Sequence, residues 1–304
     1  MLDPKVASLL AVAEKKNFTR AAEALSLSQP AVSHHINQLE DELGETLFIR
    51  GKGPLRLTGA GEIAVQYAKR LTTIYQRMRM AIEDASRDLT RLRVGVTHTA
   101  ESNIVAEVLA QYGHENPGVV ITILTDSINN LYDRLGNYDL DMAIVEGASN
   151  VPEFNFILLD TDYLVCAMSN DHPLAGQSMV SLEALQKERM ILRLAESATI
   201  NLFIANLESM NRSIDEFNVI LEVDNIATIK DLIRKDLGIS ILPKSTCMDE
   251  VSKGKMTILP IENMSMIRET KIVYPKDFAH TEVLHDITRL YRKIAKKRNR
   301  TTGA

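Results

Sequence analysis

The chain has 304 residues, enough for two or three domains, and its 45% hydrophobic and 25% charged residues are ordinary for a globular protein. No apolar run approaches the length of a membrane span, and residues 1–20 carry no secretory signal pattern, so we expect a cytoplasmic protein without a membrane partner. The two cysteines, Cys166 and Cys247, lie far apart without a metal-binding spacing, and we expect both to be buried structural thiols.

The formal net charge of −5 is unevenly distributed along the chain. Residues 1–60 hold seven basic and seven acidic side chains, whereas residues 289–300 hold seven basic side chains and no acidic one. Because DNA affinity depends on basic groups close to phosphate, the overall negative charge does not exclude a DNA-binding protein. A neutral N-terminal segment would bind DNA weakly as a monomer, which favours two linked copies.

Residues 18–25 have the pattern of a short helix. Ala21, Ala22 and Leu25 share one face, and Thr19 is placed as the N-cap. A turn at residues 27–28 is expected to follow.

A second helix is predicted directly after Ser28, which would cap free backbone N–H groups, while Pro30 is tolerated near a helix start. One face carries an apolar stripe of Val32, Ile36, Leu39 and Leu43. The other face carries short or neutral hydrogen-bonding side chains, namely Ser28, Gln29, Ser33, His34 and Gln38. A helix-turn-helix protein needs such a face to meet base edges, although a solvated helical hairpin would also have a polar face.

Two short apolar runs flank a Gly-Lys-Gly-Pro turn at residues 51–54 and predict a β-hairpin wing. Arg50 and Lys52 lie at this turn, where basic side chains would reach phosphate. The wing favours DNA binding over a solvated hairpin. The predicted DNA-binding residues are Thr19, Arg20, Ser28, Gln29, Pro30, Ser33, His34, Gln38, Arg50 and Lys52.

Residues 7–58 resemble the N-terminal domain of LysR-type transcriptional regulators. The motifs that carry the resemblance lie at 18–23, 28–40, 44–50 and 57–61, with a weaker match over the rest of the chain that includes 238–243. The resemblance implies an α+β protein with an N-terminal winged helix-turn-helix, a long linker helix and a C-terminal two-lobed α/β effector domain like a periplasmic binding protein. We expect these parts at residues 1–58, 59–88 and 89–304.

Residues 58–87 contain no proline and have the apolar pattern of a heptad seam. The recurring residues are Ala64, Tyr67, Leu71, Ile74, Met78 and Ala81, with Ile63 and Ile82 widening the seam. Such a helix either packs on its own domain or pairs with a second copy. Its length and its basic outer faces favour a homodimer, and the resemblance implies the same role. We also expect a homotetramer.

From residue 91 the chain alternates short apolar strands with helical segments, which predicts a parallel sheet. Strands are expected at 91–97, 119–125, 140–147, 163–169, 190–193, 217–223, 239–243 and 267–274. Helices are expected near 102–112, 131–135, 200–210, 226–235 and 281–297. Chain crossings near 160–163 and 265–269 suggest two lobes around a cleft, lobe I at 91–161 and 267–300 and lobe II at 162–266.

Ligands of open α/β sheets bind beyond the carboxyl ends of the strands, and four such ends carry polar residues here. Thr99 and Thr199 stand at helix starts in the two lobes, where hydroxyl and backbone N–H groups would hold a carboxylate. N-capping explains each threonine alone, but the matched pair favours a ligand cleft. The resemblance also places Thr99 at an effector-contacting position. The predicted effector-binding residues are Thr97, Thr99, Ala100, Glu101, Ser127, Glu146, Ser197, Thr199 and Thr228.

The chemistry of these residues bounds the expected effector. A small carboxylate or an amino acid is expected; Glu101 and Glu146 make the cleft more acidic than a simple anion site, which favours the amino acid because it carries both charges. His98 is either a cleft residue or a structural histidine, and the structural role is favoured because it stands alone. Asp224 or Asn225 is expected to cap the following helix.

The sequence has no nucleophile elbow, phosphate-binding loop, zinc motif or dinucleotide motif, so we expect no enzyme, no cofactor and no metal. A ligand-responsive transcription factor competes with two other classes, a sensory module that controls protein partners without DNA and a two-lobe transferase. The recognition-helix pattern favours the first. The expected partners are double-stranded DNA, a small-molecule effector, a second copy of the chain and RNA polymerase.

Overall fold

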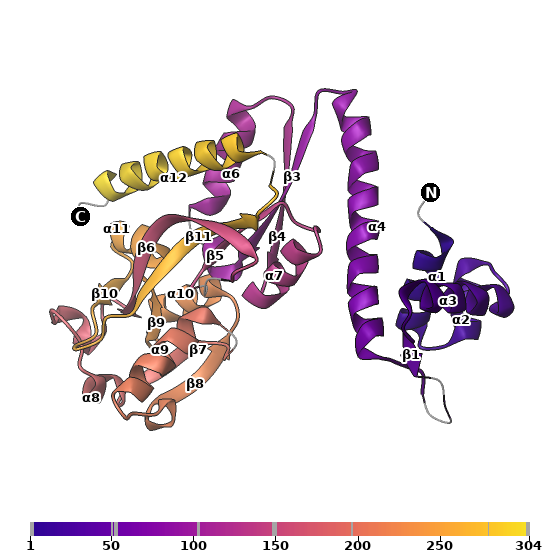
Figure 1. Ribbon diagram of the computed structural model, residues 1–304. Helices are drawn as coiled ribbons and strands as arrows, with labels where there is room; N and C mark the ends of the chain where they lie inside the picture. The colour runs from indigo at the N-terminus through magenta and orange to yellow at the C-terminus, as the bar shows by residue number, and fades with distance from the viewer. Residues whose placement is uncertain are drawn as a thin grey trace. The chain divides into compact units, whose positions relative to one another are not determined.

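The structure is a computed structural model that describes residues 3–49, 51, 54–101, 104–147, 151–195, 197–278 and 280–301 (Figure 1). The chain divides into two compact units, one of residues 1–90 with 136–139 and one of residues 91–135 with 140–304. Within the described ranges, no helix combines the length and apolar character needed to cross a membrane.

The first unit is helical apart from one short hairpin. Its elements are α1 (Pro4–Lys15), α2 (Phe18–Leu25), α3 (Gln29–Leu43), β1 (Phe48–Ile49), β2 (Arg56–Leu57) and α4 (Gly59–Ala85). The first three helices pack around one small core that includes Leu9, Val12, Ala21, Val32 and Ile36, all less than 3% exposed. This core fixes which face of α3 points outward, since the helix buries the stripe that the sequence predicts.

The N-cap of α2 differs from the prediction. Asn17 caps the helix, because its side chain accepts the backbone N–H of Arg20 at 3.0 Å. Thr19 therefore lies inside the first turn and does not cap it. The prediction was wrong because Asn and Thr two positions apart both suit an N-cap, and sequence alone does not separate them.

Ser28 does cap α3, accepting the N–H of Ala31 at 3.3 Å, and Pro30 is the second residue of the helix. The apolar stripe is shorter than predicted. Leu43 is 53% exposed, because the last turn of α3 extends past the helical core. The buried stripe thus ends at Leu39, which is partly buried.

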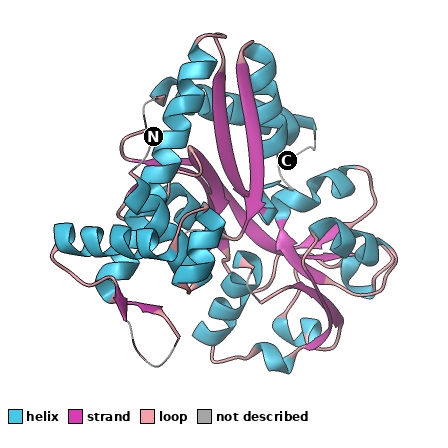
Figure 2. Cartoon of the chain, turned by 90° about the vertical axis from the view of Figure 1, so that its right-hand side faces the viewer, coloured by secondary structure: helices cyan, strands magenta, loops and turns pink. Residues whose placement is uncertain are grey.

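The predicted wing is a two-stranded antiparallel hairpin, β1 with β2 (lower left in Figure 2). Its first strand is held to α3 by Glu40, whose carboxylate accepts the N–H of Leu47 at 2.7 Å and of Phe48 at 3.3 Å. Arg50 and Lys52, the predicted phosphate contacts, lie outside the described residues.

Helix α4 follows the wing directly and runs for 27 residues, as predicted. Thr58 is its N-cap and accepts the N–H of Gly61 at 2.9 Å. Gly61 is required by a close approach, because a Cβ at this position would lie 2.1 Å from the carbonyl oxygen of Leu47.

The second unit is an α/β domain. Its strands are β3 (Thr90–Thr97), β4 (Val119–Asp126), β5 (Met142–Glu146), β6 (Phe154–Met168), β7 (Arg189–Arg193), β8 (Asn218–Val223), β9 (Ser240–Pro243), β10 (Thr257–Leu259) and β11 (Ile267–Pro275). Its helices are α5 (His98–Glu101), α6 (Val105–Glu115), α7 (Ile128–Gly136), α8 (Leu182–Leu185), α9 (Ala198–Ser209), α10 (Ile226–Arg234), α11 (Lys244–Ser252) and α12 (Thr281–Thr301), with short 3₁₀ turns at Pro173–Gly176 and Ile214–Glu216.

The main sheet is mixed, not parallel as predicted. Its strand order is β10-β6-β11-β5-β3-β4, and β9 also pairs with β6. Strands β3 and β5 are parallel, but β11 is antiparallel to both β5 and β6. The prediction failed because helix–strand alternation predicts parallel neighbours only for strands joined directly by a crossover helix, whereas β11 reaches its neighbours β5 and β6 after the whole of residues 169–266.

Strand β6 is longer than predicted and connects two hydrophobic cores. Its first part pairs with β11 as far as Tyr163, and from Leu164 onward it pairs with β9 and β10. One core packs α6 and α12 against β3 and β5, and another packs α9 against β7 and β9. These cores define lobe I and lobe II. As predicted, Cys166 and Cys247 are buried and free, and burial raises the pKa of the Cys247 thiol to about 12.

The contact between Gly61 and Leu47 gives a test of this packing. Gly61→Ala would force a methyl group against a backbone carbonyl, and such overpacking costs about 1–3 kcal/mol. We expect hydrogen exchange of α3 and the wing to speed up accordingly in the full chain. Gly59→Ala is the matched control, because no atom of the described residues lies within 4 Å of a methyl group added there. Equal protection in both variants would contradict the close approach.

Candidate functional site

The exposed face of α3 is the first candidate site. Gln29, Pro30, His34 and Gln38 are exposed on this helix, Ser33 is partly exposed, and Ser28 is exposed at its cap. Thr19 and Arg20 are exposed on the neighbouring helix α2. The predicted DNA-binding residues with described side chains are thus accessible, and those on α3 lie opposite its buried stripe.

Helix α4 carries the second candidate surface, an apolar stripe exposed along most of its length. The stripe consists of Ile63, Tyr67, Leu71, Ile74, Met78 and Ile82, each between 45% and 64% exposed. Their spacing of three and four residues places them on one helical face. An apolar surface of this extent marks an interaction site.

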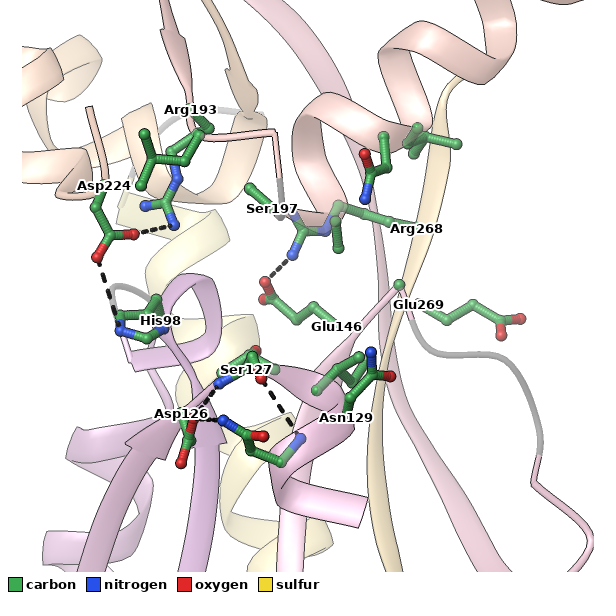
Figure 3. Close-up of a pocket in the computed structure, with 18 of the residues that line it drawn as sticks. His98, Asp126, Ser127, Asn129, Glu146, Arg193, Ser197, Asp224, Arg268 and Glu269 are labelled. Carbon is green, nitrogen blue, oxygen red and sulfur yellow. Dashed lines mark hydrogen bonds and ion pairs between the residues drawn. The ribbon is translucent and has the colours of Figure 1, made fainter. Parts of the chain in front are cut away.

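A cavity of about 870 Å³ lies between the two lobes of the second unit. It is lined by the ends of β3, β4, β5 and β7 and by the starts of α7, α9 and β11 (Figure 3). This is the location expected for a ligand of an α/β domain, beyond the carboxyl ends of its strands.

The cavity contains only some of the predicted effector-binding residues. Thr97, Ser127, Glu146 and Ser197 line it. The other positions with described side chains do not: Ala100 is fully buried, Thr199 is buried behind the lining, and Thr228 is exposed elsewhere. The side chains of Thr99 and Glu101 lie outside the described part of the structure.

A buried ion pair forms the wall of the cavity. Arg268 at the start of β11 donates from Nη2 to Glu146 of β5 and from Nη1 to the Thr199 hydroxyl at 3.0 Å. Glu146 and Arg268 are 1% and 3% exposed, and the Thr270 hydroxyl also donates to Glu146, at 3.4 Å. Burial lowers the pKa of Arg268 to about 10, which leaves its guanidinium charged at neutral pH.

This pair corrects two expectations. Glu146 does not make the cleft acidic, because Arg268 neutralises it. Thr199 is neither the N-cap of α9 nor exposed to the cavity, since Ser197 caps that helix by accepting the Thr199 N–H at 3.3 Å. The partner of Glu146 is 122 residues away in the chain, so no local pattern reveals it.

A second arginine faces the cavity from lobe II. Arg193 ends β7, is 5% exposed, and donates from Nη2 to the Asp224 carboxylate at 3.2 Å. Burial lowers the pKa of Arg193, and the nearby Asp224 carboxylate partly offsets that shift. The other Asp224 oxygen lies 4.0 Å from Nε2 of His98 in lobe I, so Asp224 points toward both residues (Figure 3). His98 also lines the cavity, which is the alternative that the sequence left open for it.

The opposite wall carries an ordered carboxylate. Asp126 accepts the side-chain N–H of Asn130 at 2.7 Å and the backbone N–H of Ser127 at 2.8 Å. The Asn130 hydrogen bond is the largest cause that lowers the Asp126 pKa, with smaller contributions from Ser127 and Arg134. Asp126 is therefore ionised and lines the cavity, and its Oδ2 also pairs with Nε of Arg134 at 3.6 Å.

Three polar atoms of the lining have unused hydrogen-bonding capacity. Thr97 Oγ1, Arg193 Nε and Arg268 Nε are buried and have no hydrogen-bond partner among the described residues. Buried polar groups usually have partners, so these atoms point to a ligand or water. No three His, Cys, Asp or Glu side chains in the described part of the chain are grouped to hold a metal ion.

Comparison with protein families identifies the two units. Residues 5–62 match the bacterial regulatory helix-turn-helix protein of the lysR family, and residues 86–294 match the LysR substrate binding domain. The chain belongs to the LysR family. This LysR-family protein is therefore a DNA-binding transcriptional regulator with an effector-binding domain.

Curated relatives of this LysR-family regulator have regulatory names. A probable RuBisCO transcriptional regulator of Thalassiosira pseudonana is 30% identical over 277 residues, which cover 88% of this chain and 89% of the relative. The regulator CysL of Bacillus subtilis is 27% identical, with 88% and 89% covered. The activator CmpR of a Synechocystis strain is 28% identical, with 88% and 86% covered.

Solved structures share the fold of this LysR-family regulator. Full-length CbnR in complex with its target DNA aligns with a TM-score of 0.65 and 18% identity, covering 96% of this chain and 99% of that one. A full-length OxyR variant of Pseudomonas aeruginosa aligns with a TM-score of 0.62 and 22% identity, covering 95% and 93%. The predicted fold, with its helix-turn-helix, long helix and two-lobed α/β domain, is confirmed.

The Arg268–Glu146 pair generates a stability prediction. Arg268→Met would leave Glu146 buried without a partner, which costs about 3–5 kcal/mol. We expect hydrogen exchange in β5 and β11 of the full chain to show this loss, and the double variant Arg268→Met with Glu146→Gln to recover part of it. The control is Arg289→Met, since Arg289 is 73% exposed in its pair with Asp286 and should contribute about 0–1 kcal/mol. Equal effects of the two single variants would disprove the role of the pair.

Proposed function

We propose that this LysR-family regulator binds specific DNA through the exposed face of α3 and the wing, and that a small polar effector in the inter-lobe cavity modulates this activity. The observation that carries the proposal is the cavity itself, because its lining presents three buried polar atoms with unused hydrogen-bonding capacity. Thr97, Ser127 and Ser197 are the proposed effector contacts with described side chains. Thr99 and Glu101 remain proposals from sequence alone.

The proposed effector carries a carboxylate, as in a small organic acid or an amino acid. Two arginines with unpaired Nε atoms line the cavity and favour an anionic group. Asp126 lines the same cavity, and its carboxylate, which is shared with Arg134, would suit an ammonium group. An amino acid presents both charges and is compatible with both walls.

DNA recognition is tested by substitutions on α3. After genomic binding-site mapping has supplied the operator, Gln29→Ala and Ser33→Ala should each weaken operator binding by roughly 1–3 kcal/mol while changing affinity for random DNA little. Fluorescence anisotropy over a range of salt concentrations measures both affinities.

The matched control is Gln111→Ala, which removes a surface glutamine of the second unit. It should leave both affinities unchanged. If Gln29→Ala and Ser33→Ala weaken binding equally on operator and random DNA, these side chains position the protein and do not read bases. Absence of salt-dependent DNA binding by the wild-type protein would overturn the proposed function.

The homodimer is proposed to form through the exposed stripe of α4. Leu71→Asp combined with Ile74→Asp would place two charges in an apolar interface, and burial of an unpaired charge costs several kcal/mol, about 3 or more. Sedimentation velocity of the double variant should show the loss of that dimer contact.

The control introduces the same two negative charges on α4 but outside the exposed apolar stripe. Gln66 and Gln76 are exposed on other faces of α4, so Gln66→Asp with Gln76→Asp should sediment as wild type. If the Leu71 and Ile74 variant also sediments as wild type, the stripe does not hold the dimer.

The division into residues 1–58, 59–88 and 89–304 is part of the proposal, as is a cytoplasmic location, which is compatible with a DNA-binding role. Association into a homotetramer and contact with RNA polymerase rest on the sequence and the family resemblance.

A further inference from the structure

Arg193 is a buried cation whose guanidinium is held by a hydrogen bond on one side only. It ends β7, is 5% exposed, and lines the inter-lobe cavity. Its described hydrogen bond runs from Nη2 to Asp224, and its Nε has no hydrogen-bond partner among the described residues. A guanidinium presents a planar fork that can bind both oxygens of a carboxylate. The single hydrogen bond to Asp224 therefore leaves donors of Arg193 available for a ligand.

The carboxylate paired with Arg193 is largely exposed to solvent. Asp224 is 58% exposed and precedes Asn225, the N-cap of α10. Water competes for the exposed Asp224 carboxylate but not for the buried Arg193 guanidinium, and this one-sided competition weakens the pair. The second Asp224 oxygen approaches His98 Nε2 at 4.0 Å, so the same side chain reaches from lobe II toward lobe I across the cavity (Figure 3).

Arg268 is the competing anion site and is held much more firmly. Both of its Nη atoms are engaged, with Glu146 and with Thr199. Its carboxylate partner is 1% exposed, and removing the arginine from that partner would strand a buried charge. An incoming anion therefore displaces Asp224 from Arg193 more easily than Glu146 from Arg268.

From these contacts we infer that Arg193 is the carboxylate-binding residue of the effector site and that Asp224 is an internal competitor that the effector carboxylate displaces. The inference rests on the proposed function, since it assumes that the cavity holds the effector. Displacement exchanges one carboxylate for another on the same guanidinium. It also releases Asp224 from His98, which removes a contact between the lobes and makes effector affinity depend on the lobe arrangement.

Chemical complementation tests the assignment without knowing the effector. Asp224→Ala removes a side chain that ends in an acetate-like group, so free acetate should take its place on Arg193. We expect sodium acetate, against sodium chloride of equal ionic strength, to raise the melting temperature of the full-length Asp224→Ala protein saturably. Its half-saturating concentration should be about tenfold or more below that of wild type, because the competitor is gone. Asp224→Ser vacates the same position and should respond alike.

Two controls isolate the arginine. Asp231→Ala removes an aspartate of similar exposure, 59%, that pairs with Arg234 away from the cavity, so its acetate response should equal that of wild type. Arg193→Met in the Asp224→Ala background should abolish the gain. The inference is overturned if Asp224→Ala and Asp224→Ser respond no better than Asp231→Ala, or if the gain survives Arg193→Met.

The outcome is separable from that of the proposed function. DNA binding by the wild-type protein is measured independently of acetate. Intact operator binding together with a failed complementation would remove Arg193 as the carboxylate-binding residue and leave the regulator assignment standing. Loss of specific DNA binding would overturn the proposed function whatever acetate does.

Discussion

The buried bond between Glu146 and Arg268 constrains the whole effector-binding unit. Glu146 ends a strand of lobe I, Arg268 lies where β11 passes between the lobes, and Thr199 on α9 of lobe II accepts a further hydrogen bond from the same guanidinium. The Arg268 side chain thus joins both lobes, and all three residues of this contact are at most 3% exposed. Because a charge buried there cannot be left unpaired, the strand ends that line the cavity are held in fixed positions.

The two arginines of the cavity have different roles, because their carboxylate partners differ in solvent exposure. Arg268 pairs with a carboxylate that is 1% exposed and serves the framework. Arg193 pairs with Asp224, which is 58% exposed and can rotate into solvent. The same type of ion pair is therefore a fixed support in one place and an exchangeable contact in the other.

Sequence patterns predicted local features well where one residue determines the local hydrogen bonding. Ser28 was expected to cap α3 and does so, and the long helix Gly59–Ala85 falls within the predicted range 58–87. The interlocking motifs of the first unit also led to its family. The patterns failed where the deciding contact is distant. Glu146 was taken as an acidic ligand contact because its partner is on another strand, and Arg193 was overlooked at the end of an apolar run.

Strand β6 pairs with β11 at one end and with β9 and β10 at the other, so both lobes share an unbroken strand. The lobes are therefore not joined by a flexible linker. Any change in the angle between them must change the twist of β6 and β11. The pairing of these strands has a register shift between Thr270 and Lys271, and a bulge increases local twist and bends a strand. Effector-driven motion in this unit is thus expected to be a small change in the twist of this strand pair, centred a few residues from Arg268.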